Sequence, residues 1–328
     1  MESFIFAVGA VMPLILMVSL GYFLKRIGFI KPDFAVVANK LVFRVLLPAM
    51  LFLNVYKIEA TEDISFGYVI YTLCAVLTVF ALVLIASRYL TKNPARRGVL
   101  LQGSFRSNFA LIGIALASSL FGERGVAASA VLSAVVIPSF NALAVISLSI
   151  FSLGKEKPSF KKILVATAKN PLIISALVGL FCLLVRSAFV EWGIEFRLSD
   201  VTPVFRVLEY LSSASTPIAL IVLGVQFEFS AISEMKREII SGVVLRCAIV
   251  PVLAIGCAYV FFGDIFRPEH FAALIAAFAT PVAVSSVPMS QEMNGDAALA
   301  GQLVVWTTVF SAVTLIGICY FFRAVGVF

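Results

Sequence analysis

The chain has 328 residues, of which 61% are hydrophobic and 13% charged, against about 45–50% apolar and about 25% charged residues in an ordinary soluble domain. This composition excludes a soluble enzyme. A net charge of +7 would suggest nucleic-acid binding in a soluble protein. In a membrane protein the basic residues report orientation instead, so no nucleic-acid partner is expected.

Apolar runs of about 20 residues, long enough to cross a hydrocarbon core of roughly 30 Å, recur along the whole chain. They predict an all-α polytopic membrane protein that has the lipid bilayer as its surroundings. The first run is expected to be retained, because the acidic start Met1-Glu2-Ser3 lacks the basic region of a signal peptide. Ten transmembrane helices are expected, at residues 2–24, 35–57, 65–89, 98–121, 125–152, 161–188, 204–227, 237–262, 268–291 and 296–323.

Lys and Arg residues are distributed unevenly between the two sides of this arrangement. The connections after spans one, three, five, seven and nine carry 15 of them, and the opposite side carries seven. Positive charge concentrates on the cytoplasmic side of membrane proteins. The odd-numbered connections are therefore expected in the cytoplasm, and both termini outside.

The two halves of the chain share several features. Met12-Pro13 in span one resembles Asn170-Pro171 in span six, and Pro48 in span two has a counterpart in Pro217 in span seven. Each half also has a polar interruption in its fourth span. Because five spans is an odd number, a second half that repeats the first must enter the membrane from the opposite face, as in many secondary transporters. We therefore expect two inverted five-helix repeats, at residues 1–154 and 155–328.

The interruption in span four contains Arg106, followed by Ser107 and Asn108. Arg106 lies nine residues past Arg97, hence about 13 Å into the membrane at about 1.5 Å per residue. A charge at such a depth costs roughly 2.5–3.5 kcal/mol on insertion scales, so it usually faces the interior and has a partner. If the helix unwinds here, the guanidinium and the freed N–H groups suit an anion such as a carboxylate. Snorkelling to the cytoplasmic face is the alternative.

The interruption in span nine contains Thr280-Pro281 and then Ser285, Ser286 and Pro288. Each proline removes a backbone donor and disturbs the preceding turn, which frees carbonyl groups for a substrate or a cation. The two serine hydroxyls could add ligands. A simple kink, with small residues that serve helix packing, is the alternative.

Two further arginines, Arg44 and Arg246, lie at similar depth but have apolar neighbours, so we expect both to snorkel toward the cytoplasm. No Asp or Glu occurs in the middle of any predicted span. The embedded positive charge therefore lacks a fixed counter-ion, which favours an anionic substrate and argues against the paired acids of a cation/proton antiporter.

Metal and cofactor chemistry is not expected. The five cysteines have no motif spacing, and the single histidine, His270, has no neighbouring ligand residue. An intramembrane enzyme would need a nucleophile and a base at matching depth, and none is evident. A membrane sensor that does not transport is a distant alternative. Such proteins usually carry a cytoplasmic output domain, and this sequence ends at Phe328, just past the tenth predicted span.

Several segments resemble bacterial members of the auxin efflux carrier family. The resemblance begins with Gly21-Tyr-Phe-Leu-Lys-Arg-Ile-Gly28 and Asn39-Lys-Leu-Val-Phe-Arg-Val-Leu-Leu-Pro48 and continues through Arg106-Ser-Asn108 and Thr280-Pro281. It implies a scaffold of spans one, two, six and seven, and a transport domain in which the broken spans four and nine cross. It also implies elevator-type movement of an organic anion, a location in the bacterial inner membrane, and a crossover site at Asn108, Arg106 and Pro281.

The chain departs from this family in one respect. Many relatives have a proline shortly after the glycine of span four, whereas this sequence reads Gly113-Ile114-Ala115. The resemblance therefore does not guarantee a complete break there, and Gly113 is the expected source of flexibility. The candidate substrate-binding residues are Arg106, Ser107, Asn108, Gly113, Thr280, Pro281, Ser285 and Ser286.

The substrate and the coupling are less defined than the site. Bacterial relatives are associated with small carboxylates such as malonate. A sodium-coupled symporter of the bile-acid type is the nearest rival, since its general fold is similar. A coupling ion, H⁺ or Na⁺, and a homodimer are further open expectations.

Overall fold

The computed structural model describes residues 2–57, 66–152, 165 and 168–328. Within these ranges the chain is helical, and the β-structure is a single isolated bridge. Among the described residues, six helices are long and apolar enough to cross a membrane, or seven if one bent pair is a single span. These helices confirm an all-α multi-pass membrane protein. The count of ten spans stays a prediction, and the run expected at 161–188 begins largely outside the described residues.

The first half of the chain contains both straight and interrupted helices. Pro94 starts one of them, with the Asn93 side chain accepting a hydrogen bond from the Ala95 N–H (3.0 Å), a common way to begin a helix. The elements are α1 (Glu2–Arg26), α2 (Pro32–Leu41), the π-helix η1 (Val42–Leu46), α3 (Leu47–Tyr56), α4 (Phe66–Leu90), α5 (Pro94–Phe105), the π-helix η2 (Phe109–Gly113) and α6 (Ile114–Ser152).

The second half begins its first long helix in the same way. Pro171 is in the first turn, and the Asn170 side chain accepts from the Leu172 N–H (2.9 Å). The elements are α8 (Pro171–Glu191), η3 (Leu198–Asp200), α9 (Thr202–Gln226), α10 (Ala231–Glu234), α11 (Lys236–Val244), the π-helices η4 (Leu245–Ile249) and η5 (Val252–Gly256), α12 (Cys257–Phe262), α13 (Pro268–Phe278), α14 (Ser286–Glu292) and α15 (Ala297–Ala324).

Helix α6 turns back on itself near its start. Its backbone is not helical at Phe121 and Gly122, where Gly122 has a φ of 54°. A Cβ atom on Gly125 would collide with the carbonyl of Ala117, whereas residues eight apart in a continuous helix are about 12 Å apart. The chain therefore reverses direction at Gly122, between the spans predicted at residues 98–121 and 125–152.

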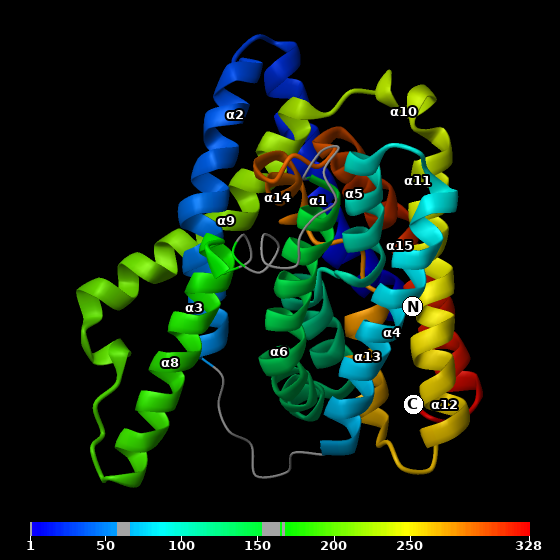
Figure 1. The fold of residues 1–328 in the computed structure, drawn as a ribbon. Coiled ribbons are helices and arrows are strands. Elements are labelled where there is room, and N and C mark those ends of the chain that lie inside the picture. Colours follow the sequence, from blue (N-terminus) through cyan, green and yellow to red (C-terminus); the bar gives the residue numbers. More distant parts are fainter. Residues whose placement is uncertain (1, 58–65, 153–164, 166–167) are drawn as a thin grey trace.

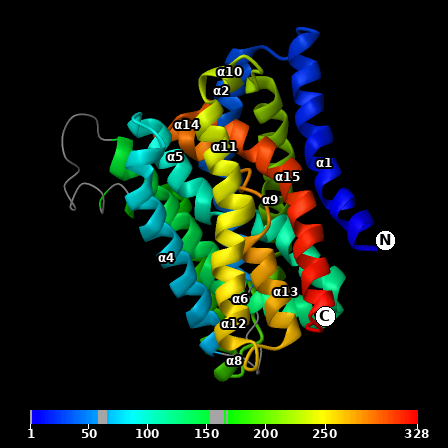
Figure 2. The same ribbon diagram turned by 90° about the vertical axis from the view of Figure 1, so that its right-hand side faces the viewer.

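The helices form two groups by their contacts, and in Figure 1 helices α2, α3, α8 and α9 of one group lie to the left of α4, α5, α6, α11 and α13 of the other. In the panel group, α1 and α3 pack on α9, α3 also packs on α8, and α2 packs on α9. In the core group, α5 packs on α4 and α6, α13 packs on α6, and α11 and α14 pack on α15. Figure 2 shows α1 running along the outside beside α15, which it also contacts.

Helices α13 and α8 differ strongly in how deeply they are buried. Helix α13 lies inside the core group and is buried without interruption from Phe271 to Phe278. Helix α8 in the panel group exposes apolar side chains such as Leu177 and Phe181. An apolar surface of this kind suits contact with lipid chains, whereas the enclosed α13 brings the span-nine interruption to the middle of the protein.

Candidate functional site

The interruptions in spans four and nine meet inside the core group. Helix α5 ends at Phe105, and the backbone is extended at Arg106. Ser107 and Val282 form an antiparallel bridge. The Asn108 N–H donates to the Pro281 carbonyl (2.7 Å), and the Ala283 N–H donates to the Arg106 carbonyl (3.2 Å). The two breaks thus satisfy each other's backbone groups, as a membrane interior requires.

The break in span four does not depend on a proline. It occurs at Arg106–Asn108, before Gly113, so the missing family proline does not prevent it. Gly113 lies within η2, where a Cβ atom would be only 2.9 Å from the Ala276 carbonyl oxygen. Its small size therefore allows η2 to approach α13, and the flexibility expected of Gly113 from the sequence stays a prediction.

Arg106 is buried, with 3% of its surface exposed, so the snorkelling alternative is wrong for this residue. Its Nη2 donates to Asn141 Oδ1 (2.7 Å), and its Nη1 makes a long contact to Ser286 Oγ (3.5 Å). Asn141 is held in place because its Nδ2 donates to the Ile137 carbonyl (2.9 Å). A guanidinium has five N–H donors, so these neutral partners leave part of its capacity unused.

The two residues after Arg106 also carry unused polar atoms. Ser107 and Asn108 are each 5% exposed. Among the described residues, Ser107 Oγ and Asn108 Nδ2 have no hydrogen-bond partner although both atoms are buried. An unsatisfied buried polar atom costs about 1–3 kcal/mol, which is why such atoms often mark a site that a ligand completes.

A small cavity of about 50 Å³ lies against these atoms. One water needs about 10–15 Å³ measured in this way, so the space suits a group of a few atoms. The cavity lies between the core group and the panel group. Its polar lining residues are Arg106, Ser107, Asn108, Asn141 and Ser285 from the core group, and Asn54, Ser215 and Thr216 from α3 and α9.

The other predicted site residues do not line this cavity, but three of them lie at the crossover. Pro281 accepts the backbone bond from Asn108. Thr280 donates its hydroxyl to the Ala276 carbonyl (2.8 Å), and Ser286 contacts Arg106 as described above. The structure therefore brings Arg106, Ser107, Asn108 and Ser285 to the cavity and gives Thr280, Pro281 and Ser286 supporting positions.

The expectation that Arg246 snorkels toward the cytoplasm is wrong. This residue of η4 is fully buried, and all three guanidinium nitrogens donate to main-chain carbonyls. Nε donates to Thr280 (2.8 Å) and Nη2 to Ala277 (3.1 Å), while Nη1 donates to Ser104 (3.0 Å) and Phe105 (3.3 Å). Sequence reasoning missed this role because the partners are backbone atoms, which leave no side-chain signal.

The surroundings of Arg44 differ from those of Arg106 and Arg246. Its side chain is 66% exposed and pairs with Glu292 (3.2 Å), an acid at the end of α14. The prediction that the embedded arginines lack fixed counter-ions is therefore wrong for Arg44. It holds for the crossover within the described chain, where Arg106 and Arg246 have neutral partners.

Comparison with known families identifies the family of this chain. A family model described as "Membrane transport protein" matches residues 6–159 and 154–319. The chain belongs to this family, the auxin efflux carrier family. The resemblance noted in the sequence is thereby confirmed, and family membership indicates a transporter, not an enzyme.

Two relatives of this membrane transport protein cover nearly its whole length, and a third covers about two thirds of it. An "Uncharacterized transporter" of Methanothermobacter thermautotrophicus is 24% identical over 93% of the chain and 95% of its own length. A protein named "Putative malonate transporter" of Rhizobium meliloti is 22% identical over 96% of each. An "Uncharacterized transporter" of Methanocaldococcus jannaschii is 24% identical over 68% of the chain and 69% of its own length.

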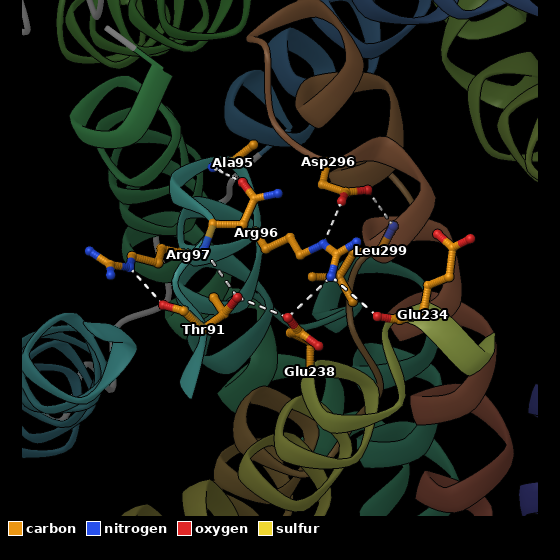
Figure 3. A network of polar contacts seen from close by, with 9 residues as sticks. Thr91, Ala95, Arg96, Arg97, Glu234, Glu238, Asp296 and Leu299 are labelled. Carbon is orange, nitrogen blue, oxygen red and sulfur yellow. Dashed lines mark hydrogen bonds and ion pairs between the residues drawn. The ribbon is translucent and has the colours of Figure 1, made fainter. Parts of the chain in front are cut away.

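The transporter also has a partly buried ionic network at the starts of three core helices (Figure 3). Arg96 pairs with Asp296 (3.0 Å) and Glu238 (3.2 Å), and Thr91 donates its hydroxyl to Glu238 (2.8 Å). These contacts join α5, α11 and α15. Glu238 is buried, and because it is paired with Arg96 it is not available to the crossover arginines.

Proposed function

We propose that the protein is a secondary transporter for a small organic anion, and that Arg106 with Ser107 and Asn108 binds a carboxylate of the substrate. The observation that carries this proposal is the set of unused donors around one cavity. Arg106 has spare N–H groups, and Ser107 Oγ and Asn108 Nδ2 lack partners within the described chain. A carboxylate accepts several hydrogen bonds and would satisfy all three groups.

The charge at this place supports an anion over a cation. Arginine binds a carboxylate through two parallel hydrogen bonds, which are stronger than bonds to neutral acceptors. The helix that runs through η2 also begins here, and Phe109 and Ala110 line the cavity. The first N–H groups of a helix have no acceptor within the helix and carry partial positive charge. Both features attract negative charge.

The size of the cavity supports a small substrate. A volume of about 50 Å³ accommodates a carboxylate and few further atoms in this conformation. The relative from Rhizobium meliloti is named for malonate, a compact dicarboxylate. Short mono- and dicarboxylates are therefore the first substrates to test.

We further propose an elevator mechanism on a scaffold of ten spans in two inverted five-helix repeats, with both termini outside the bacterial inner membrane. Both interruptions belong to the core group and are bonded to each other, so the site would move as a unit. The panel group contributes the facing wall of the cavity. Sliding of the core group along this wall would expose the carboxylate to alternate sides of the membrane.

Such a movement must break a polar contact between the groups. Asn39 of α2 donates to Gln226 of α9 (3.1 Å) and also to Gln291 of α14, and Gln226 donates to Gln291 (3.0 Å). Gln291 is thus held by the panel group while its own helix belongs to the core group. Neutral amide contacts of this kind contribute about 1 kcal/mol each, so they can open during transport.

Binding of short carboxylates by purified protein tests the proposed function. A ligand that binds the folded state raises its Tm, by roughly 4 °C at about 100 times Kd for a chain of this length. We expect a shift in the wild type and none in Arg106→Ala. Arg44→Ala is the matched control, because it removes an exposed arginine outside the cavity, and it should shift like the wild type. If a carboxylate raises the Tm of Arg106→Ala as much as that of Arg44→Ala, the assignment of the site is wrong. If no carboxylate raises the Tm of any of the three proteins, the proposed substrate class is wrong.

A further inference from the structure

Arg246 holds together the two helix ends that approach the crossover from one side. Ser104 and Phe105 end α5, and Ala277 and Thr280 lie at the end of α13. The last carbonyls of a helix have no partner within it and carry partial negative charge. Two negative helix ends therefore converge on one guanidinium, which lies 2.8–3.3 Å from four carbonyl oxygens.

A cluster of main-chain carbonyls at the ends of broken helices is the ligand set that transporters of this general design use for a coupling Na⁺. We propose that Arg246 is a resident cation that takes the place of such an ion. Its charge is permanent, because arginine stays protonated in proteins. Assembly of the crossover then requires no Na⁺ from solution.

The surrounding charges support this assignment. Arg106 directly follows Phe105, whose carbonyl Arg246 binds. A further cation at this place would therefore meet two fixed positive charges. The buried acid Glu238 lies eight residues before Arg246, about 12 Å along the helix, and is paired with Arg96. The described residues also contain no cluster of three acidic, His or Cys side chains that could hold a metal ion.

The proposal makes Arg246 a positioning residue for the substrate site. By binding the carbonyls of Ser104 and Phe105 it sets the direction in which the chain leaves α5. The next residue is Arg106, and Asn108 follows two residues later. The shape of the carboxylate site would thus depend on a cation that the protein supplies itself, and a bound Na⁺ would be unnecessary at this position.

Thermal stability in different cations tests the proposal without any substrate, so its failure is distinguishable from failure of the carboxylate site. Wild-type protein should have the same Tm in sodium chloride and in choline chloride at equal concentration. Arg246→Ala leaves four carbonyls without a donor, and we expect its Tm to fall by roughly 10 °C. Sodium, or guanidinium at a few millimolar, should restore part of this loss, whereas choline should not.

Arg106→Ala is the matched control, because it removes a buried arginine from the same crossover without emptying the carbonyl cluster. Its Tm should not respond to sodium or guanidinium. If Arg246→Ala does not fold, Arg246→Lys and Arg246→Met replace it, and the charged Lys variant should be the more stable. The proposal is overturned if wild type is stabilised by sodium, if Arg246→Ala ignores both cations, if Arg106→Ala responds as well, or if Lys and Met variants are equally stable.

Discussion

Arg106 and Arg246 are buried at the same crossover, yet their surroundings differ. Arg246 has main-chain acceptors for all three of its nitrogens. Arg106 has one short bond to Asn141 and one long contact to Ser286, and it lies on a cavity beside two unpartnered atoms. A fully satisfied guanidinium stabilises the fold, whereas a partly satisfied one retains the capacity to bind. Hydrogen-bond completeness, and not burial, separates the two roles.

The largest effect on the fold is expected from Arg246→Ala. Removal of one partner from a buried charged contact costs about 3–5 kcal/mol, because the remaining groups stay buried and unpaired. Arg106→Ala should cost much less, since it removes fewer bonds. The comparison requires the free energy of unfolding, or the Tm, of both variants in the same detergent. Equal losses would contradict the distinction between the two arginines.

Substrate binding should show the reverse order of sensitivity. Arg106→Ala should lower carboxylate affinity by about 100-fold, which corresponds to about 2.7 kcal/mol and to a lost charge-assisted contact. Arg106→Lys keeps the charge but loses the planar fork, so it should recover only part of the affinity. Titration calorimetry with the best carboxylate measures both variants. Full affinity in Arg106→Ala would exclude this residue as the anchor.

Smaller effects on affinity are expected from the two neighbours of Arg106. Asn108→Ala and Ser107→Ala each remove a neutral donor, and we expect roughly 10-fold weaker binding from each. Their stability without substrate should not fall through lost side-chain bonds, because Ser107 Oγ and Asn108 Nδ2 have no partner within the described residues. A large loss of Tm with unchanged carboxylate affinity would show that these side chains stabilise the fold and do not bind the substrate.

The smallest effect is expected at the third arginine. The Arg44 side chain is 66% exposed, whereas that of its partner Glu292 is 9% exposed. Because water screens the guanidinium side of this pair, we expect the pair to contribute about 1 kcal/mol. Arg44→Ala should therefore leave both Tm and carboxylate affinity close to wild type. The Glu292→Gln variant is the companion test, since it removes the same pair from the other side. If Arg44→Ala loses as much Tm or affinity as Arg106→Ala, solvent exposure does not distinguish Arg44 from Arg106 and Arg246.

The amino-acid sequence by itself determined the helical membrane class, because long apolar runs must form helices where no water is present to bond the backbone. It also located both interruptions and singled out Arg106, since proline and clustered polar residues are local signals. It did not show whether the span-four helix breaks completely, because that break is stabilised by backbone bonds to Pro281 and Ala283 far along the chain.

The role of Arg246 was decided only by the tertiary structure. In the sequence its apolar neighbours make it indistinguishable from a snorkelling side chain. Its partners are carbonyls of residues 31 to 142 positions away. Every residue type has a main-chain carbonyl, so no sequence pattern marks the ones that will be left without a donor. Which carbonyls are freed, and which side chain reaches them, follows from where two broken helices end in space.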